Sequence, residues 1–128
     1  EIMKIEHIAA WVRNLEEIKE FYQTYFDACP GMKYVNSAKG FSSYFLSFES
    51  GARLELMHSD SMTSGSSSQA PGYAHLAFSV GSKEKVDELT ARLRSAGFTV
   101  ESGPRTTGDG YYESCVLDPE GNRVEITE

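Results

Sequence analysis

The chain has 128 residues, of which 40% are hydrophobic and 24% are charged, and its net charge is −7 with no basic run. This composition indicates a folded globular domain, and the acidic balance argues against a nucleic-acid or membrane-surface partner. No stretch approaches the about 20 apolar residues of a transmembrane helix. No signal peptide is visible, so we expect a cytoplasmic protein in which Cys29 and Cys115 are reduced thiols.

The first half predicts a strand, a helix and three further strands. Alternation over residues 3–12 predicts a strand that presents His7 on the face opposite its apolar set. Asn14 is positioned to cap a helix with apolar residues at helical spacing, which ends before Pro30. Three short strands are then predicted at residues 32–36, 43–48 and 52–58.

Residues 59–72 are rich in glycine and serine and predict a flexible linker. The second half then repeats the order of the first. Ser82 is positioned to cap its helix and Gly97 to end it, and residues 118–121 predict a hairpin turn. The predicted strands are residues 73–80, 98–101, 111–117 and 122–127.

The two halves form a tandem repeat that places one His and one Glu in each copy. The segment at His7 matches the segment at His75 at an offset of 68 residues, and Glu55 matches Glu125 at an offset of 70. Alternation puts all four side chains on the face that the helices do not cover. Two imidazoles and two carboxylates on such a surface are a plausible ligand set for a divalent metal ion.

Other side chains are candidates for contacting a substrate: Trp11, Arg53, Tyr112 and Arg123. The two arginines are repeat-equivalent and share the face of the glutamates, so they could hold an anionic substrate, or they could support the ligands or serve only at the surface. In a non-catalytic binding protein, Tyr44 would join Trp11 and Tyr112 in an aromatic cup. His58 has no His counterpart in the second copy and is interpreted as a surface residue.

These residues together resemble the glyoxalase I branch of the vicinal oxygen chelate superfamily over nearly the whole chain. The segments that carry the resemblance are His7-Ile8-Ala9, Arg53-Leu54-Glu55-Leu56, His75-Leu76-Ala77 and Asp118-Pro119-Glu120-Gly121-Asn122-Arg123-Val124-Glu125. The resemblance implies an α+β fold in one domain, residues 1–128. Two tandem βαβββ modules, residues 1–58 and 73–128, would form an eight-stranded, cup-shaped mixed sheet with the helices on its outer face.

The resemblance also implies a metal centre and a partner chain. The ligands would be His7, Glu55, His75 and Glu125, and the metal would be nickel, cobalt or zinc, with manganese or iron as alternatives. A homodimer is implied, in which each site combines ligands from both chains; pairing of the two modules within one chain is the alternative geometry.

The implied activity is that of a lyase or isomerase acting on a 2-hydroxycarbonyl thiol adduct through an enediolate. Glu125 would be the catalytic base and Glu55 its pseudo-symmetric counterpart. An epimerase, a dioxygenase and a small-molecule binding or resistance protein are the alternatives. Trp11 and Ser59 stand where glutathione-dependent members carry an Arg and an Asn, so we do not expect glutathione to be the thiol.

Overall fold

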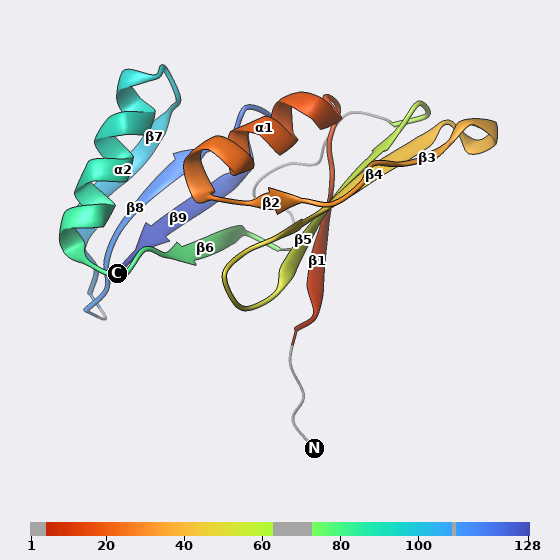
Figure 1. Cartoon of the computed structure of the whole chain (residues 1–128). Coiled ribbons are helices and arrows are strands. Elements are labelled where there is room, and N and C mark those ends of the chain that lie inside the picture. The colour runs from red at the N-terminus through yellow and green to blue at the C-terminus, as the bar shows by residue number, and fades with distance from the viewer. Residues whose placement is uncertain (1–4, 63–72, 109) are drawn as a thin grey trace. The chain divides into compact units, whose positions relative to one another are not determined.

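A computed structural model describes residues 5–62, 73–108 and 110–128 of the chain. The chain divides into two compact units, Glu1–Gly65 and Ser66–Glu128 (Figure 1). Residues 63–72 of the predicted linker lie outside the described residues, so the linker and the organisation as one domain stay predictions. In the described part of the chain, no helix is long and apolar enough to span a membrane.

The first unit is a five-stranded sheet with one α-helix on one face. Its strand order is β1-β5-β4-β2, with β3 paired to β4; β1 runs parallel to β5 and the other pairs are antiparallel. The elements are β1 (His7–Trp11), α1 (Leu15–Phe26), β2 (Cys29–Pro30), β3 (Tyr34–Asn36), the short 3-10 helix η1 (Ser37–Lys39), β4 (Phe41–Ser47) and β5 (Arg53–Ser59).

The second unit repeats this plan with four strands in the order β6-β9-β8-β7, where β6 is parallel to β9. Its elements are β6 (His75–Ser79), α2 (Lys83–Ser95), β7 (Val100–Thr106), β8 (Tyr112–Leu117) and β9 (Arg123–Thr127). In both units, the first strand lies at an edge of the sheet, beside the last strand. The predicted α+β fold of two tandem modules is therefore confirmed.

Both predicted helix caps are present. The Asn14 side chain accepts a hydrogen bond from the backbone N–H of Glu17 at 3.1 Å, and Ser82 accepts one from Lys85 at 3.2 Å. At the end of α2, the N–H of Phe98 reaches back to the carbonyl of Leu93 at 3.0 Å. This bond closes a Schellman motif, which requires the positive φ of the intervening Gly97.

The core of each unit lies between its helix and its sheet, because α1 packs on β4 and β5 while α2 packs on β7, β8 and β9 (Figure 1). Fully buried side chains on the helix side of the first unit include Ile18, Leu46 and Leu56. In the second unit they include Val86, Leu93, Val116, Val124 and Ile126. Burial of such side chains is the dominant favourable contribution to folding.

The described residues form one five-stranded and one four-stranded sheet, which is one strand more than the eight strands predicted. The extra strand is β2, which precedes the strand predicted at residues 32–36. Cys29 and Pro30 pair with the end of β4, and the chain returns to β4 only at Tyr34. A bend of this kind leaves no periodic signal in the sequence.

The predicted strand at residues 98–101 was also misplaced, because β7 extends to Thr106 through Gly103 and Pro104. Pro104 cannot donate to a ladder, but β7 is the last strand of its sheet, where a missing donor can be tolerated. The pairing of β7 with β8 shifts register on both sides of Ser102. The residues that break the strand pattern are therefore accommodated by irregular pairing at an edge.

Candidate functional site

Strand pairing places the histidines and glutamates of both units on equivalent surfaces. Ala9 lies opposite Glu55 in the β1–β5 ladder, and Ala77 lies opposite Glu125 in the β6–β9 ladder. The neighbours of Glu55 along β5 are buried on the helix side, so Glu55 points to the opposite face. The same alternation holds for Glu125 in β9. We call this surface the helix-free face of each unit.

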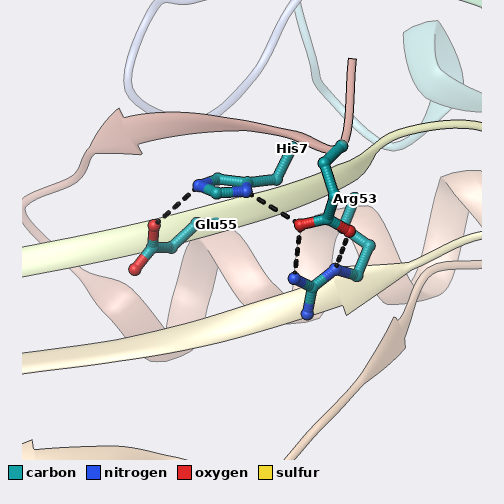
Figure 2. Close-up of polar contacts among 4 residues, drawn as sticks. His7, Arg53 and Glu55 are labelled. Atoms are coloured by element: carbon teal, nitrogen blue, oxygen red, sulfur yellow. Dashed lines mark hydrogen bonds and ion pairs between the residues drawn. The ribbon is translucent and has the colours of Figure 1, made fainter. Parts of the chain in front are cut away.

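Each unit brings its His and Glu close together on this face. The Nε2 atom of His7 lies 3.8 Å from Oε1 of Glu55, as Figure 2 shows, and the Nε2 atom of His75 lies 3.2 Å from Oε1 of Glu125. The imidazole side chains are 42% and 39% exposed, whereas the carboxylate side chains are 17% and 23% exposed. The carboxylates are thus partly sheltered while both rings remain accessible.

A third carboxylate, Glu6, contacts His7 from the side away from Glu55. Its Oε1 atom lies 3.0 Å from Nδ1 of His7 and accepts a hydrogen bond from Nη2 of Arg53 at 2.7 Å, while Oε2 accepts one from Nε of Arg53 at 3.0 Å. The hydrogen bonds from Arg53 and His7 lower the pKa of Glu6 to about 2. Glu6 is therefore ionised at neutral pH.

The ring of Phe45 contacts both His7 and Arg53. Phe45 is the cross-strand partner of Glu55. The ring of His7 meets it edge-on at a centroid distance of 5.3 Å and an interplanar angle of 81°, and the guanidinium carbon of Arg53 lies 4.2 Å from its centroid. Both His7 and Arg53 are therefore held by a ring contact as well as by Glu6.

The second unit uses different residues around its pair. Arg123 donates from Nε to Glu101 at 2.7 Å. Cys115 stands opposite Glu125, where the first unit has Phe45, and burial together with the charge of Glu101 raises the pKa of its thiol. Both arginines that were candidates for binding a substrate are thus already paired with carboxylates. Cys29 and Cys115 are both free thiols, as expected.

The aromatic candidates occupy two different faces. Trp11 lies on the helix-free face, is 54% exposed, and contacts Phe41 edge-on at 6.2 Å. Tyr44 and Tyr112 instead lie on the helix side of their sheets. Their predicted place in an aromatic cup was therefore wrong.

The two tyrosines bridge sheet to helix in the same way. The hydroxyl of Tyr44 donates to the carboxylate of Glu16 in α1 at 3.0 Å, and that of Tyr112 donates to Asp87 in α2 at 2.5 Å. A lysine of the same helix lies over each ring, at 5.0 Å and 5.6 Å from the centroid. These contacts give both tyrosines a structural role within their units.

His58 is not the solvated surface residue that was predicted. It lies on the helix side of β5 and is partly buried, with Nδ1 at 3.0 Å from the backbone carbonyl oxygen of Val12. Its Nε2 atom lies 3.4 Å from Asp60. His58 therefore ties the end of β1 to β5 and stays apart from the His7–Glu55 pair.

The donor chemistry of the two pairs fits a divalent metal. Each pair offers one imidazole nitrogen and one carboxylate, which suits nickel, cobalt, zinc, iron or manganese. Among the described residues, no three His, Cys, Asp or Glu side chains lie close enough together to hold a metal ion. The pair in each unit therefore supplies two candidate ligands, one nitrogen donor and one oxygen donor.

Comparison with known proteins agrees with this fold. The profile of the glyoxalase/bleomycin resistance protein/dioxygenase superfamily matches residues 4–126, so the chain belongs to this superfamily. A possible glyoxalase from Bacillus cereus is 26% identical, with a TM-score of 0.75 and coverage of 99% of this chain and 100% of that one. The glyoxalase family protein of Enterococcus faecalis is 25% identical, with a TM-score of 0.80 and coverage of 98% and 97%.

Two further similarities are more limited. The trypanothione-dependent glyoxalase I of Leishmania major is 22% identical, with a TM-score of 0.80 and coverage of 99% of this chain and 87% of that one, which is a likeness of fold. The uncharacterized protein YqjT of Bacillus subtilis (strain 168) is 38% identical over 58 residues. That match spans 43% of this chain and 45% of the length of YqjT.

Sequence reasoning missed Glu6, Phe45 and Glu101. Glu6 and Glu101 have no acidic equivalent in the opposite copy, so a search for repeated residues passes over them. Phe45 is found only once the register of β4 against β5 is known. A useful signal was nevertheless present, since an acidic residue directly precedes a candidate ligand, His7.

Proposed function

We infer that the protein is a divalent-metal-dependent lyase of the glyoxalase I type, which isomerises a thiol adduct of a 2-hydroxycarbonyl compound. The observation that supports this is the repetition of one His–Glu pair on the helix-free face of each unit, at 3.8 Å and 3.2 Å. Membership of the superfamily adds support, because its members generally use divalent metal ions. The ligands would be His7, Glu55, His75 and Glu125.

The two carboxylates would carry the proton chemistry. Glu125 would take a proton from the carbon beside the substrate carbonyl and return it to the adjacent carbon, with Glu55 in the pseudo-symmetric position. When bound, the metal would supply Lewis-acid stabilisation of the charge that develops on the two substrate oxygens. The partial shelter of both carboxylates suits this task, because reduced contact with water strengthens electrostatic interactions.

The thiol is proposed to be something other than glutathione. Trp11 lies on the same face as Glu55, and Ser59 is at the end of β5 on that face. Neither side chain carries the charge needed to pair with a carboxylate of the thiol. The arginine on this face, Arg53, already holds Glu6.

The first test is metal content and turnover. After dialysis, purified protein should retain about one nickel, cobalt or zinc ion for every two His–Glu pairs, which is about one ion per chain. His7→Ala and His75→Ala should each lose this ion. The metal-loaded protein should convert methylglyoxal in the presence of a suitable thiol. Full metal retention by His75→Ala would refute the ligand assignment, whereas metal binding without turnover of any thiol adduct would favour a binding protein.

The second test concerns which units share a site. We expect a homodimer in which the first unit of one chain meets the second unit of its partner. A mixture of His7→Ala and His75→Ala chains would then contain dimers with one intact site, so metal binding and turnover should return on mixing. If the units pair within one chain, each chain in the mixture stays defective. Light scattering at micromolar concentration that shows only a monomer of 14.2 kDa would also exclude the dimer.

A further inference from the structure

Glu6 contacts His7 and Arg53 at the same time. Its two oxygens accept two hydrogen bonds from Arg53, at 2.7 Å and 3.0 Å, and Oε1 also lies 3.0 Å from Nδ1 of His7. A carboxylate held by two parallel N–H bonds of a guanidinium has a defined orientation as well as a favourable charge interaction. The position of the Glu6 carboxylate is therefore set by Arg53.

The contact with Glu6 decides which nitrogen of a neutral His7 carries the proton. A carboxylate can only accept, so Nδ1 must be the donor, and the lone pair is then left on Nε2. Nε2 is the atom that lies 3.8 Å from Glu55 on the helix-free face (Figure 2). Histidines that bind metals generally donate their second N–H to a carboxylate, a carbonyl or a water in this way.

We propose that Glu6, held by Arg53, is a positioning residue that keeps His7 in the Nδ1-protonated tautomer with Nε2 directed to the ligand position beside Glu55. The metal part of this inference rests on the proposed function. The contact of Arg53 with Phe45 at 4.2 Å extends the support, because the guanidinium is fixed between a ring and a carboxylate. Arg53 therefore acts through Glu6 and is not a free binding group for an anionic substrate.

The second unit lacks this arrangement and so provides a comparison within the same chain. Ala74 stands directly before His75, where the first unit has Glu6. Arg123 pairs with Glu101, and the described contact of the His75 ring with a carboxylate is at Nε2, with Glu125. In the part of the chain that the structure describes, Glu101 thus holds an equivalent arginine and contacts no imidazole.

This difference gives a matched pair of variants. Glu6→Ala makes the first unit resemble the second, while Glu101→Ala removes an arginine-bound carboxylate that contacts no histidine. The Glu6 side chain is 60% exposed and that of Glu101 is 39% exposed, so both chains should fold. If Glu6 were only a surface ion pair, the two variants would behave alike, because exposed ion pairs contribute little.

The first readout is the tautomer of His7 in metal-free protein, measured from the ¹⁵N shifts of its ring at a pH where the ring is neutral. Wild type and Glu101→Ala should show the Nδ1-protonated form as the main species. Glu6→Ala should show a clear loss of that form, and Arg53→Met should show a smaller loss because Glu6 remains but is no longer fixed. A His7 ring that has the same tautomer in wild type and Glu6→Ala would overturn the proposal.

The second readout is Ni²⁺ affinity, measured by competition with a chelator. Glu6→Ala should weaken binding by about 10- to 100-fold, which is the usual effect of removing an outer partner of a ligand, and Glu101→Ala should stay within about threefold of wild type. Equal affinities in the two variants would overturn the role of Glu6 in ligand positioning. If wild-type protein binds no Ni²⁺, Co²⁺ or Zn²⁺, the proposed function fails, and the tautomer measurement alone decides whether Glu6 positions His7.

Discussion

Replacement of Gly103 tests the close approach of β7 to β8, the pairing that brings Glu101 to Arg123 and Cys115. Gly103 has a φ of +80°, and a Cβ atom placed on it would lie 2.5 Å from the carbonyl oxygen of Glu113 and 3.0 Å from Cα of Ser114. Both neighbours are backbone atoms and cannot turn away. Gly103→Ala should therefore force the two strands apart.

Gly121→Ala is the matched control. Its φ of +84° is almost the same, but apart from its chain neighbours no described residue lies within 4 Å of the added Cβ. Each variant pays about 1–2 kcal/mol for a left-handed backbone that carries a side chain, and gains about 0.4–1 kcal/mol from a less flexible unfolded chain. Forcing a methyl group into a closely packed position adds about 1–3 kcal/mol. Gly103→Ala should thus be less stable than Gly121→Ala by about 2 kcal/mol.

The comparison is made by urea unfolding followed by circular dichroism. For a slope of about 1.5 kcal/mol/M, a difference of about 2 kcal/mol places the midpoint of Gly103→Ala about 1.3 M lower than that of Gly121→Ala. Equal midpoints would show that β7 gives way without cost, and would contradict the reasoning from the two backbone contacts.

Three further outcomes are expected. The pKa of Glu16 is lowered from 4.5 in the folded protein, first by its hydrogen bond with Lys33. The ionised carboxylate therefore stabilises the fold above pH 4.5, and this stabilisation is lost as the pH falls through the lower pKa of the folded state. Glu16→Gln should therefore reduce the fall in melting temperature that wild type shows below about pH 4.5. His58→Ala should lower the free energy of unfolding by about 0.5–1.5 kcal/mol, because the carbonyl of Val12 loses its partner, and should leave metal content measured by mass spectrometry at the wild-type level. With glutathione and methylglyoxal, kcat/KM of the wild type should stay below about 10⁶ M⁻¹s⁻¹. Trp11→Arg combined with Ser59→Asn should raise kcat/KM by about 10- to 100-fold. A wild-type value above that limit would contradict the argument from the missing charge.

The sequence predicted those parts of the site that depend on repetition and on strand alternation. His7 and His75 could be assigned to one face because a strand alternates with a period of two, and Glu55 and Glu125 follow from the same rule. Cap chemistry is local, so Asn14 and Ser82 could be recognised without knowledge of the fold.

The parts that were missed depend on contacts between distant segments. Both faces of β8 mix polar and apolar residues, so alternation did not place Tyr112, and its partner Asp87 lies 25 residues away in α2. Glu6 precedes the first residue of β1, so strand alternation does not govern its direction. Its contact with Arg53 spans 47 residues and depends on the parallel register of β1 and β5.

The histidines lie on the outermost strands of their sheets, whereas the glutamates lie one strand further in. Within the described residues of each unit, β1 pairs only with β5 and β6 pairs only with β9, so one side of each histidine-bearing strand has backbone groups without a ladder partner. Another strand that joined this edge would pair with the strand that carries the histidine, whereas the strand that carries the glutamate would lie one strand further away. In the proposed dimer, association and metal binding would be coupled: whatever favours association would increase the affinity for a shared ion, and the ion would strengthen association by the same factor.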